Sequence, residues 1–205
     1  MTIAIEILLT LVVGYLLGSI PFALVIGKIF YHKDIRLYGS RNLGGGNAGR
    51  VLGKKAGLAV MTLDILKVTL VIFLTSFLPH PEVFTILGGL AAAVGHCFPL
   101  FAGFKGGKAV ATMYGFLFGM MLFQGYSPWI FFLPLITFLV VLYLTKIIAL
   151  GSIVSAVVNT IYIGFTAGSP LLCLSSAIFT AMIIIRHRKN IERIAKGEEN
   201  KITWM

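Results

Sequence analysis

The chain has 205 residues, of which 58% are apolar and only 12% are charged, and its mean hydropathy is +0.97. Soluble globular domains carry about 25% charged residues, so this composition excludes an ordinary soluble enzyme and indicates an integral membrane protein. The net charge of +10 does not indicate nucleic-acid binding, because the basic residues lie between apolar runs without the interleaved aromatic residues of such proteins.

Seven apolar runs follow one another along the chain, and a helix needs about 20 residues to cross a bilayer. They cover residues 3–29, 58–78, 84–101, 109–123, 129–145, 147–167 and 171–185. Glycine and proline interrupt the third and fourth runs, so this region is open to a broken or re-entrant span. We predict an all-α integral membrane protein, a seven-transmembrane-helix bundle with one domain over residues 1–205 and a mobile tail over 196–205.

The basic residues predict the orientation of the bundle. If the segment after the first run is cytoplasmic, all of the 17 Lys and Arg residues except Lys67 fall on the cytoplasmic side. Lys67 lies in the second run, and we expect it to pair with Asp64 one helical turn earlier. The positive-inside rule then places the N-terminus outside the cell and the C-terminus in the cytoplasm.

The glycine segment, residues 39–55, reads GSRNLGGGNAGRVLGKK. Its glycines allow backbone N–H groups to turn toward an anion, Ser40, Asn42 and Asn47 add hydrogen-bond donors, and Arg50 adds charge. This composition is typical of a phosphate-binding loop. Taken alone, the segment could equally be a cytoplasmic connector whose basic residues only orient the neighbouring helices.

Two more polar segments fall on the cytoplasmic side: the lysine segment, residues 95–112 (GHCFPLFAGFKGGKAVAT), and the basic segment, residues 186–193 (RHRKNIER). Lys105 and Lys108 are three residues apart, and each pair spaced in this way shares a face if its segment is helical. His187 and Asn190 have the same spacing. We expect the three segments to converge on one site at the membrane boundary.

Two histidines have competing interpretations. The arginines on either side of His187 should keep its imidazole neutral, so that it can act as a hydrogen-bond partner or a base. His96 follows a glycine and precedes two lysines, and it is either a substrate contact or a histidine packed between helices. The basic segment alone would also serve as a plain orientation signal.

Several familiar reaction centres are absent from the sequence. Neither Gly-Lys pair has the other residues of a P-loop, and no histidine has the aspartate of the dyad found in coenzyme-A-dependent glycerolipid acyltransferases. Cys97 and Cys173 are too few for a zinc site, and no metal or organic cofactor is implied. A site with many cations and amides and few bases suits anionic substrates that carry their own leaving group.

In this combination the motifs resemble those of the bacterial acyl-phosphate:glycerol-3-phosphate 1-O-acyltransferases (PlsY). The resemblance covers nearly the whole chain, in the order Gly18-Ser19-Ile20-Pro21, the glycine segment, Gly95-His96 through Thr112, and Arg186-His187-Arg188 with Asn190-Ile191. It implies a seven-helix bundle in the bacterial cell membrane, with its active site at the cytoplasmic face.

The resemblance also implies the site residues. Glycerol phosphate would bind Ser40, Arg50, Lys108, His187 and Asn190, and the acyl phosphate would lie near Asn42 and the backbone of residues 44–47. We take His187, Lys108 and Arg50 as the catalytic candidates. The substrate-binding candidates are Ser40, Asn42, Gly44, Gly45, Gly46, Asn47, Arg50, His96, Lys105, Gly106, Gly107, Lys108, His187 and Asn190.

Four positions depart from the family's pattern. Arg41 replaces a glycine, Gly45-Gly46 replace Ala-Thr, and Ala109 stands where the lysine motif normally ends in glycine. These changes leave room for altered selectivity or for a paralogue with another acceptor.

The implied reaction transfers a fatty acyl group from acyl phosphate to the 1-hydroxyl of sn-glycerol 3-phosphate and gives lysophosphatidic acid and inorganic phosphate. The expected partners are these two substrates and membrane lipid, with no nucleic acid, and a monomer is the working expectation. The acyl chain would lie in a groove lined by residues such as Phe22, Phe101 or Phe104. The alternatives are a transporter, although no inverted repeat is present, and a binder of anionic lipid, which would not need the His, Asn and Ser residues.

Overall fold

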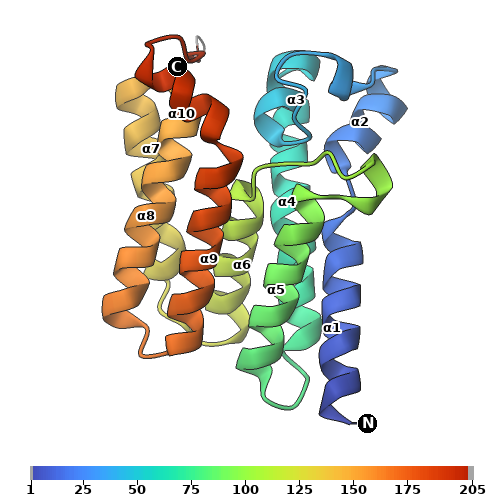
Figure 1. Cartoon of the computed structure of the whole chain (residues 1–205), viewed down its shortest axis with the longest axis vertical. Helices are drawn as coiled ribbons and strands as arrows, with labels where there is room; N and C mark the ends of the chain where they lie inside the picture. Colours follow the sequence, from blue (N-terminus) through green and yellow to red (C-terminus); the bar gives the residue numbers. More distant parts are fainter. Residues whose placement is uncertain (1, 203–205) are drawn as a thin grey trace. The chain divides into compact units, whose positions relative to one another are not determined.

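The computed structural model describes residues 2–202, and these residues form helices joined by short connections (Figure 1). Contacts between residues divide the chain into two compact units, unit 1 (Met1–Gln124) and unit 2 (Gly125–Met205), and the single domain expected from the sequence stays a prediction. The glycine and lysine segments belong to unit 1, and the basic segment belongs to unit 2.

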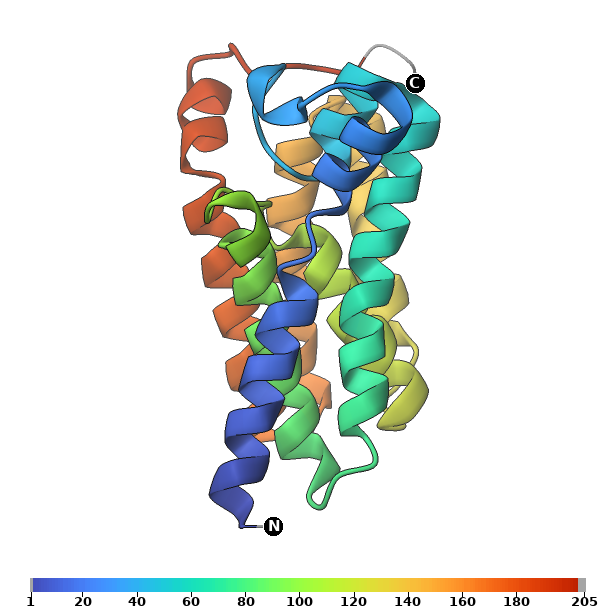
Figure 2. The ribbon, with the colours of Figure 1, turned by 90° about the vertical axis from the view of Figure 1, so that its right-hand side faces the viewer.

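Unit 1 is built on α1, which packs along α5, and on α4, which contacts α1, α5 and α6 (Figures 1 and 2). Its elements are α1 (Ile3–Gly18), α2 (Phe22–Tyr31), η1 (Ile35–Leu37), α3 (Gly45–Leu52), α4 (Lys54–Thr75), α5 (Pro81–Cys97), η2 (Leu100–Ala102) and α6 (Val110–Phe123). A Cβ at Gly18 would overlap the Ala92 carbonyl, and one at Gly95 would overlap the Tyr15 carbonyl. The absence of side chains at these two positions lets the α1 and α5 backbones touch, as is common between membrane helices.

The first apolar run, predicted as one span, is broken between α1 and α2 at residues 19–21. Pro21 lacks an N–H group and disfavours a helical conformation at Ile20, so the helix ends there and restarts at Phe22. The break leaves the Ile20 carbonyl outside the regular helical ladder, where it accepts a hydrogen bond from Lys67 Nζ at 3.0 Å.

In unit 2, α8 contacts both α7 and α9. The helices are α7 (Trp129–Thr145), α8 (Ile148–Thr166), α9 (Pro170–Arg186) and α10 (Arg188–Ala195). Hydroxyl groups join α8 to α9, because Thr160 Oγ1 lies 2.9 Å from Ser176 Oγ and 2.8 Å from Thr180 Oγ1. Such hydrogen bonds between apolar helices satisfy polar groups that have no water nearby.

Each of the seven apolar runs is helical, which confirms the all-α prediction for residues 2–202. In that part of the chain four segments are long and apolar enough to cross a membrane: Ile3–Tyr31, Lys54–Thr75, Pro81–Ala102 and Ile148–Thr166. The pair α9–α10, bent by 60°, would make a fifth, while α6 and α7 are apolar but shorter. The number of crossings and the direction of the termini stay predictions.

The C-terminal tail makes contacts with the helices as far as residue 202, and the mobility predicted for residues 196–205 stays a prediction. The Glu199 carboxylate is buried, and the Ile202 N–H donates to the Lys146 carbonyl at 2.8 Å. The last part of the predicted tail, residues 203–205, lies outside the described residues.

Candidate active site

The glycine segment is organised by the side-chain amide of Asn47, which is buried near the start of α3. Asn47 Oδ1 accepts the backbone N–H of Ser40 at 2.8 Å, and Nδ2 donates to the carbonyls of Tyr38 at 3.2 Å and Ile35 at 3.3 Å. The amide predicted to touch substrate thus fixes the loop that carries Ser40. Ser40 itself is exposed.

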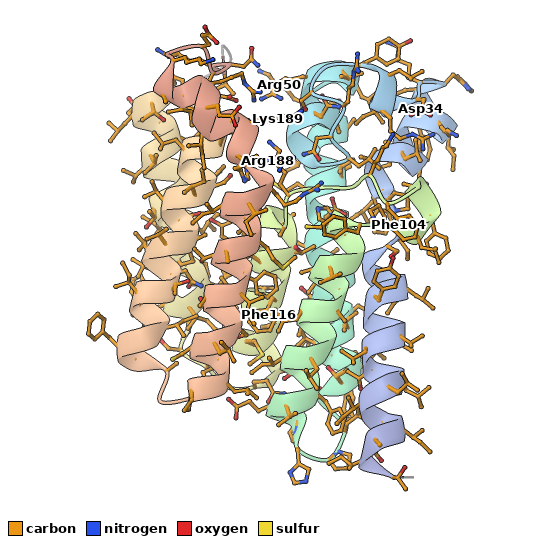
Figure 3. All side chains as sticks on the ribbon, viewed as in Figure 1. Asp34, Arg50, Phe104, Phe116, Arg188 and Lys189 are labelled. Atoms are coloured by element: carbon orange, nitrogen blue, oxygen red, sulfur yellow. The ribbon has the colours of Figure 1, made fainter. Side chains whose placement is uncertain are left out.

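The middle of the glycine segment forms the N-terminus of α3 instead of the open loop expected from its glycines. Gly44 caps the helix, and its carbonyl accepts the N–H groups of Asn47 and Ala48, both at 3.1 Å. The N–H groups of the first turn, at Gly45 and Gly46, have no acceptor within the helix and can bind an anion. Arg50 follows one turn later and is exposed (Figure 3).

The lysine segment folds back onto the end of α5. The Gly107 N–H donates to the His96 carbonyl at 2.9 Å, and a Cβ at Gly106 would overlap that same carbonyl. A Cβ at Gly107 would overlap His96 Nε2, so the imidazole ring lies directly against the Gly107 backbone. The glycine pair therefore lets the segment sit on His96 and sets the position of Lys108.

Lys105 and Lys108 do not share a helix face, because their segment is not helical. Residues 103–108 are not helical, and Phe104 and Ala109 have φ values of +58° and +61°. The lysines are presented by a turn, with Lys105 exposed and Lys108 half-buried.

The predicted ion pair in α4 is present, with Lys67 Nζ 2.7 Å from Asp64 Oδ1. His96 joins this pair, since its Nδ1 lies 3.1 Å from Lys67 Nζ and 3.5 Å from Asp64 Oδ1. All three side chains are buried. Of the two interpretations of His96, the structure supports packing between helices, and its place among the substrate contacts stays a prediction.

In unit 2, His187 is the residue at which the chain bends from α9 to α10. Its Nδ1 lies 2.8 Å from the Ile183 carbonyl, which can only accept, so a neutral imidazole carries its proton on Nδ1 and its lone pair on Nε2. Asn190 lies in the first turn of α10, where its N–H donates to the His187 carbonyl at 2.7 Å. Both side chains are buried.

The buried carboxylate of Glu199 holds two residues of α10. Its Oε1 accepts from Asn190 Nδ2 at 2.8 Å, and its Oε2 accepts from Arg193 Nε at 2.7 Å. Glu199 had no predicted role. In the sequence it appears only as an acidic residue in a polar tail that was expected to be mobile.

An open apolar groove of about 440 Å³ lies on unit 1. It is lined by Leu17, Ile20, Phe22, Leu63, Leu66, Lys67, Thr69, Leu70, Phe73 and Phe123. Of the three phenylalanines expected in an acyl groove, only Phe22 lines it, whereas Phe101 and Phe104 are exposed in the lysine segment. The described residues contain no group of three or more metal-binding side chains.

Similarity to known proteins identifies the family of this chain. Residues 8–197 match the family model described as glycerol-3-phosphate acyltransferase. The glycerol-3-phosphate acyltransferase of Listeria monocytogenes serotype 4a is 46% identical over 203 residues, which cover 98% of this chain and 99% of the relative. The chain belongs to the glycerol-3-phosphate acyltransferase family.

Other members of the family agree. The Bacillus subtilis (strain 168) glycerol-3-phosphate acyltransferase is 44% identical, with 96% of this chain and 98% of the relative covered. The crystal structure of PlsY (YgiH), an integral membrane glycerol 3-phosphate acyltransferase, in its glycerol 3-phosphate form matches with a TM-score of 0.85 and 34% identity, covering 96% of each chain. Its lysophosphatidic acid form matches with a TM-score of 0.82 and 33% identity. The resemblance to the PlsY family is confirmed, and the chain is a multi-pass membrane acyltransferase.

Two departures from the pattern that the resemblance implies lie at strained backbone positions. Arg41 and Ala109, where that pattern has glycine, have φ values of +59° and +61°. This left-handed region suits glycine and costs other residues about 1–2 kcal/mol. At Gly46 a Cβ would meet nothing within 4 Å, so the usual family threonine would fit there.

Proposed function

We propose that the chain transfers an acyl group from acyl phosphate to the 1-hydroxyl of glycerol 3-phosphate. The observation that carries this proposal is the set of anion-binding groups in unit 1, namely the first N–H groups of α3, Arg50 and the turn that presents Lys105 and Lys108. An acyl phosphate is an activated anhydride, so the protein needs chiefly to hold two mutually repelling anions together.

In the proposed reaction the 1-hydroxyl oxygen attacks the acyl carbonyl carbon. A new ester C–O bond forms, the C–O bond to phosphate breaks, and inorganic phosphate leaves. Arg50, Lys108 and the N–H groups of Gly45 and Gly46 would offset the charge of the phosphates and of the tetrahedral intermediate. We assign glycerol phosphate to Ser40, Arg50, Lys108, His187 and Asn190 on the family resemblance.

The hydroxyl proton needs an acceptor, and two candidates exist. A phosphate oxygen of the substrate can take it directly, which is the route that the family resemblance favours. The alternative is His187, whose lone pair on Nε2 suits a base. A His187→Gln variant keeps a hydrogen-bonding side chain without a base, so it should retain much of kcat in the first case and lose it in the second.

We assign the acyl chain to the apolar groove of unit 1. The one charge in its lining is Lys67, whose ammonium contacts Asp64, Ile20 and His96, so the groove presents almost only hydrocarbon. A bulky Leu66→Trp change should narrow the groove and shift the preference toward shorter acyl chains. An unchanged preference would place the chain elsewhere.

We further propose that the protein lies in the bacterial cell membrane with its C-terminus and active site on the cytoplasmic side. The support is the distribution of basic residues, all but one of which fall on one side of the predicted spans. Cysteine labelling from outside intact cells should reach a cysteine placed at His80, between α4 and α5, but not one placed at Lys105.

The test of the donor uses purified protein in lipid and labelled glycerol 3-phosphate, with palmitoyl phosphate, palmitoyl coenzyme A or palmitoyl carrier protein in separate reactions. Lysophosphatidic acid should form from palmitoyl phosphate alone and should be lost in Lys108→Ala. Product from one of the thioesters alone would overturn the proposed donor and leave the acyltransferase assignment intact. No product from any donor would point to another acceptor.

A further inference from the structure

We propose that Lys67 is a positioning residue for glycerol phosphate binding, which acts by holding His96 under the lysine segment. The inference rests on the proposed role of that segment in binding glycerol phosphate. It assigns a purpose to buried charges that the reaction itself does not use.

The ammonium group of Lys67 has three N–H bonds and three acceptors. They are Asp64 Oδ1 at 2.7 Å, the Ile20 carbonyl at 3.0 Å and His96 Nδ1 at 3.1 Å. An ammonium can donate three hydrogen bonds and accept none. Lys67 therefore ties together α4, the break between α1 and α2, and α5, and its side chain is only 3% exposed.

The same contact favours one tautomer of His96. Since an ammonium can only donate, the Lys67 contact needs Nδ1 of His96 as its acceptor, and a neutral imidazole then carries its proton on Nε2. The alternative, an Nδ1–H donated to Asp64 Oδ1, would use the longer contact of 3.5 Å. The shorter Lys67 contact favours the Nε2–H form.

The opposite edge of the ring faces the lysine segment. Nε2 lies where a Cβ of Gly107 would be, and the His96 carbonyl accepts the Gly107 N–H at 2.9 Å. The His96 side chain therefore links the Asp64–Lys67 pair to the backbone that precedes Lys108. A ring held at both edges cannot rotate without moving Gly107, so the pair sets the position of Lys108 from within α4.

The main test is a double variant, Asp64→Asn with Lys67→Met, which removes both charges and leaves no lone buried ion. Because the lysine segment would bind the phosphate of glycerol 3-phosphate before reaction and Lys108 would also offset charge in the tetrahedral intermediate, loss of its position should raise KM for glycerol 3-phosphate and lower kcat as well. We expect KM to rise about tenfold, the effect of one lost hydrogen bond to a charged group. His96→Leu should behave alike, whereas His96→Gln, which can accept and donate, should restore KM to within about threefold.

The matched control is Thr75→Val, a nearly isosteric change on α4 at another buried contact with α5. It should leave both constants unchanged. If Thr75→Val raises KM as much as the double variant does, the rise comes from general loosening of the helix packing, and the proposal is overturned. If the double variant lowers kcat and leaves KM unchanged, the buried pair affects the chemical step instead of binding, and the proposal is overturned as well.

A second measurement needs no activity and so stands apart from the identity of the acyl donor. In protein labelled with ¹⁵N-histidine, His96, assigned by comparison with His96→Gln, should show its proton on Nε2. In the double variant this preference should weaken, and trypsin should cut faster after Lys105 and Lys108. A His96 protonated on Nδ1 in the parent protein, or unchanged cleavage in the variant, would contradict the proposal.

Discussion

The glycine and lysine segments of unit 1 have similar compositions but are held in different ways. The glycine segment is fixed from within, because the amide of Asn47 binds backbone groups only 7 to 12 residues away. The lysine segment is held by contacts with another part of the chain, because an ion pair on α4 positions His96 against it. Loss of structure in the glycine segment should therefore stay local. Loss of structure in the lysine segment should accompany destabilisation of the membrane helices.

The largest effect is expected from Lys67→Met alone, which leaves the buried Asp64 carboxylate with only the longer contact to His96, at 3.5 Å. Breaking a buried ion pair by removing one partner costs about 3–5 kcal/mol, so the melting temperature of the purified protein should fall sharply. The double variant with Asp64→Asn should recover most of this loss. If the single variant melts like the parent, the buried pair does not hold unit 1 together.

Asn47→Ala should damage the glycine segment without unfolding the helices. Three hydrogen bonds would be lost, and a cost of about 2–3 kcal/mol confined to the loop should appear as a large rise in KM for glycerol 3-phosphate with a small change in melting temperature. Asn47→Asp keeps the acceptor for the Ser40 N–H and should be intermediate. A melting temperature that falls as far as in Lys67→Met would contradict the expectation that the glycine segment can lose its structure locally.

The two segments should respond alike to glycine at their strained positions. Arg41→Gly and Ala109→Gly remove the strain of a positive φ but also increase the conformational entropy of the unfolded chain. The net effect of each should be a stabilisation of about 0.5–1 kcal/mol. The mirror-image control is Gly103→Ala, at φ +64° with open space around it, which should destabilise by a similar amount. Thermal melts of the three variants measure this, and a loss of stability in Arg41→Gly would mean that its side chain makes a compensating contact.

The smallest effect concerns the loop that leads into the glycine segment. Arg36, through its side-chain hydrogen bonds, lowers the pKa of Asp34 from 3.8 to about 2. A depressed carboxyl pKa stabilises the fold above pH 3.8, and this contribution is lost as the pH falls through 2. Because the pair is partly exposed, it is worth about 1 kcal/mol at most.

The measurement for Asp34 is the difference in melting temperature between the parent protein and Asp34→Asn. It should be small at pH 5 and shrink further between pH 4 and pH 2. A difference that grows on acidification would show that another group dominates.

Much of the fold could be predicted from the sequence, because apolar runs specify membrane helices directly. The α4 ion pair followed from a spacing of three residues in one helix. The break at Pro21 was missed, since a strongly apolar run on both sides concealed it. The start of α3 was missed because consecutive glycines predict a loop, whereas packing of Gly45 and Gly49 against Gly57 of α4 favours a helix.

The candidate site residues were found from their types, but their contacts could not be. The link from Lys67 to His96 joins residues 29 positions apart, and the Glu199 contact with Asn190 joins a tail to a helix. Such pairings depend on tertiary packing and leave no periodic trace in one sequence. The strained φ at Arg41 was likewise invisible, although the family's glycine at that position was its indirect sign.

The spacing of Asp64 and Lys67 also bears on how the chain enters the bilayer. Both charges lie on one face of the same helix, so α4 can pair them as soon as it is helical, and its apolar part after Lys55 can partition into lipid without net charge. His96 belongs to α5, which is synthesised later, and it can join the pair only when α5 packs against α4. The link from the ion pair to the lysine segment can therefore form only once α4 and α5 are packed together.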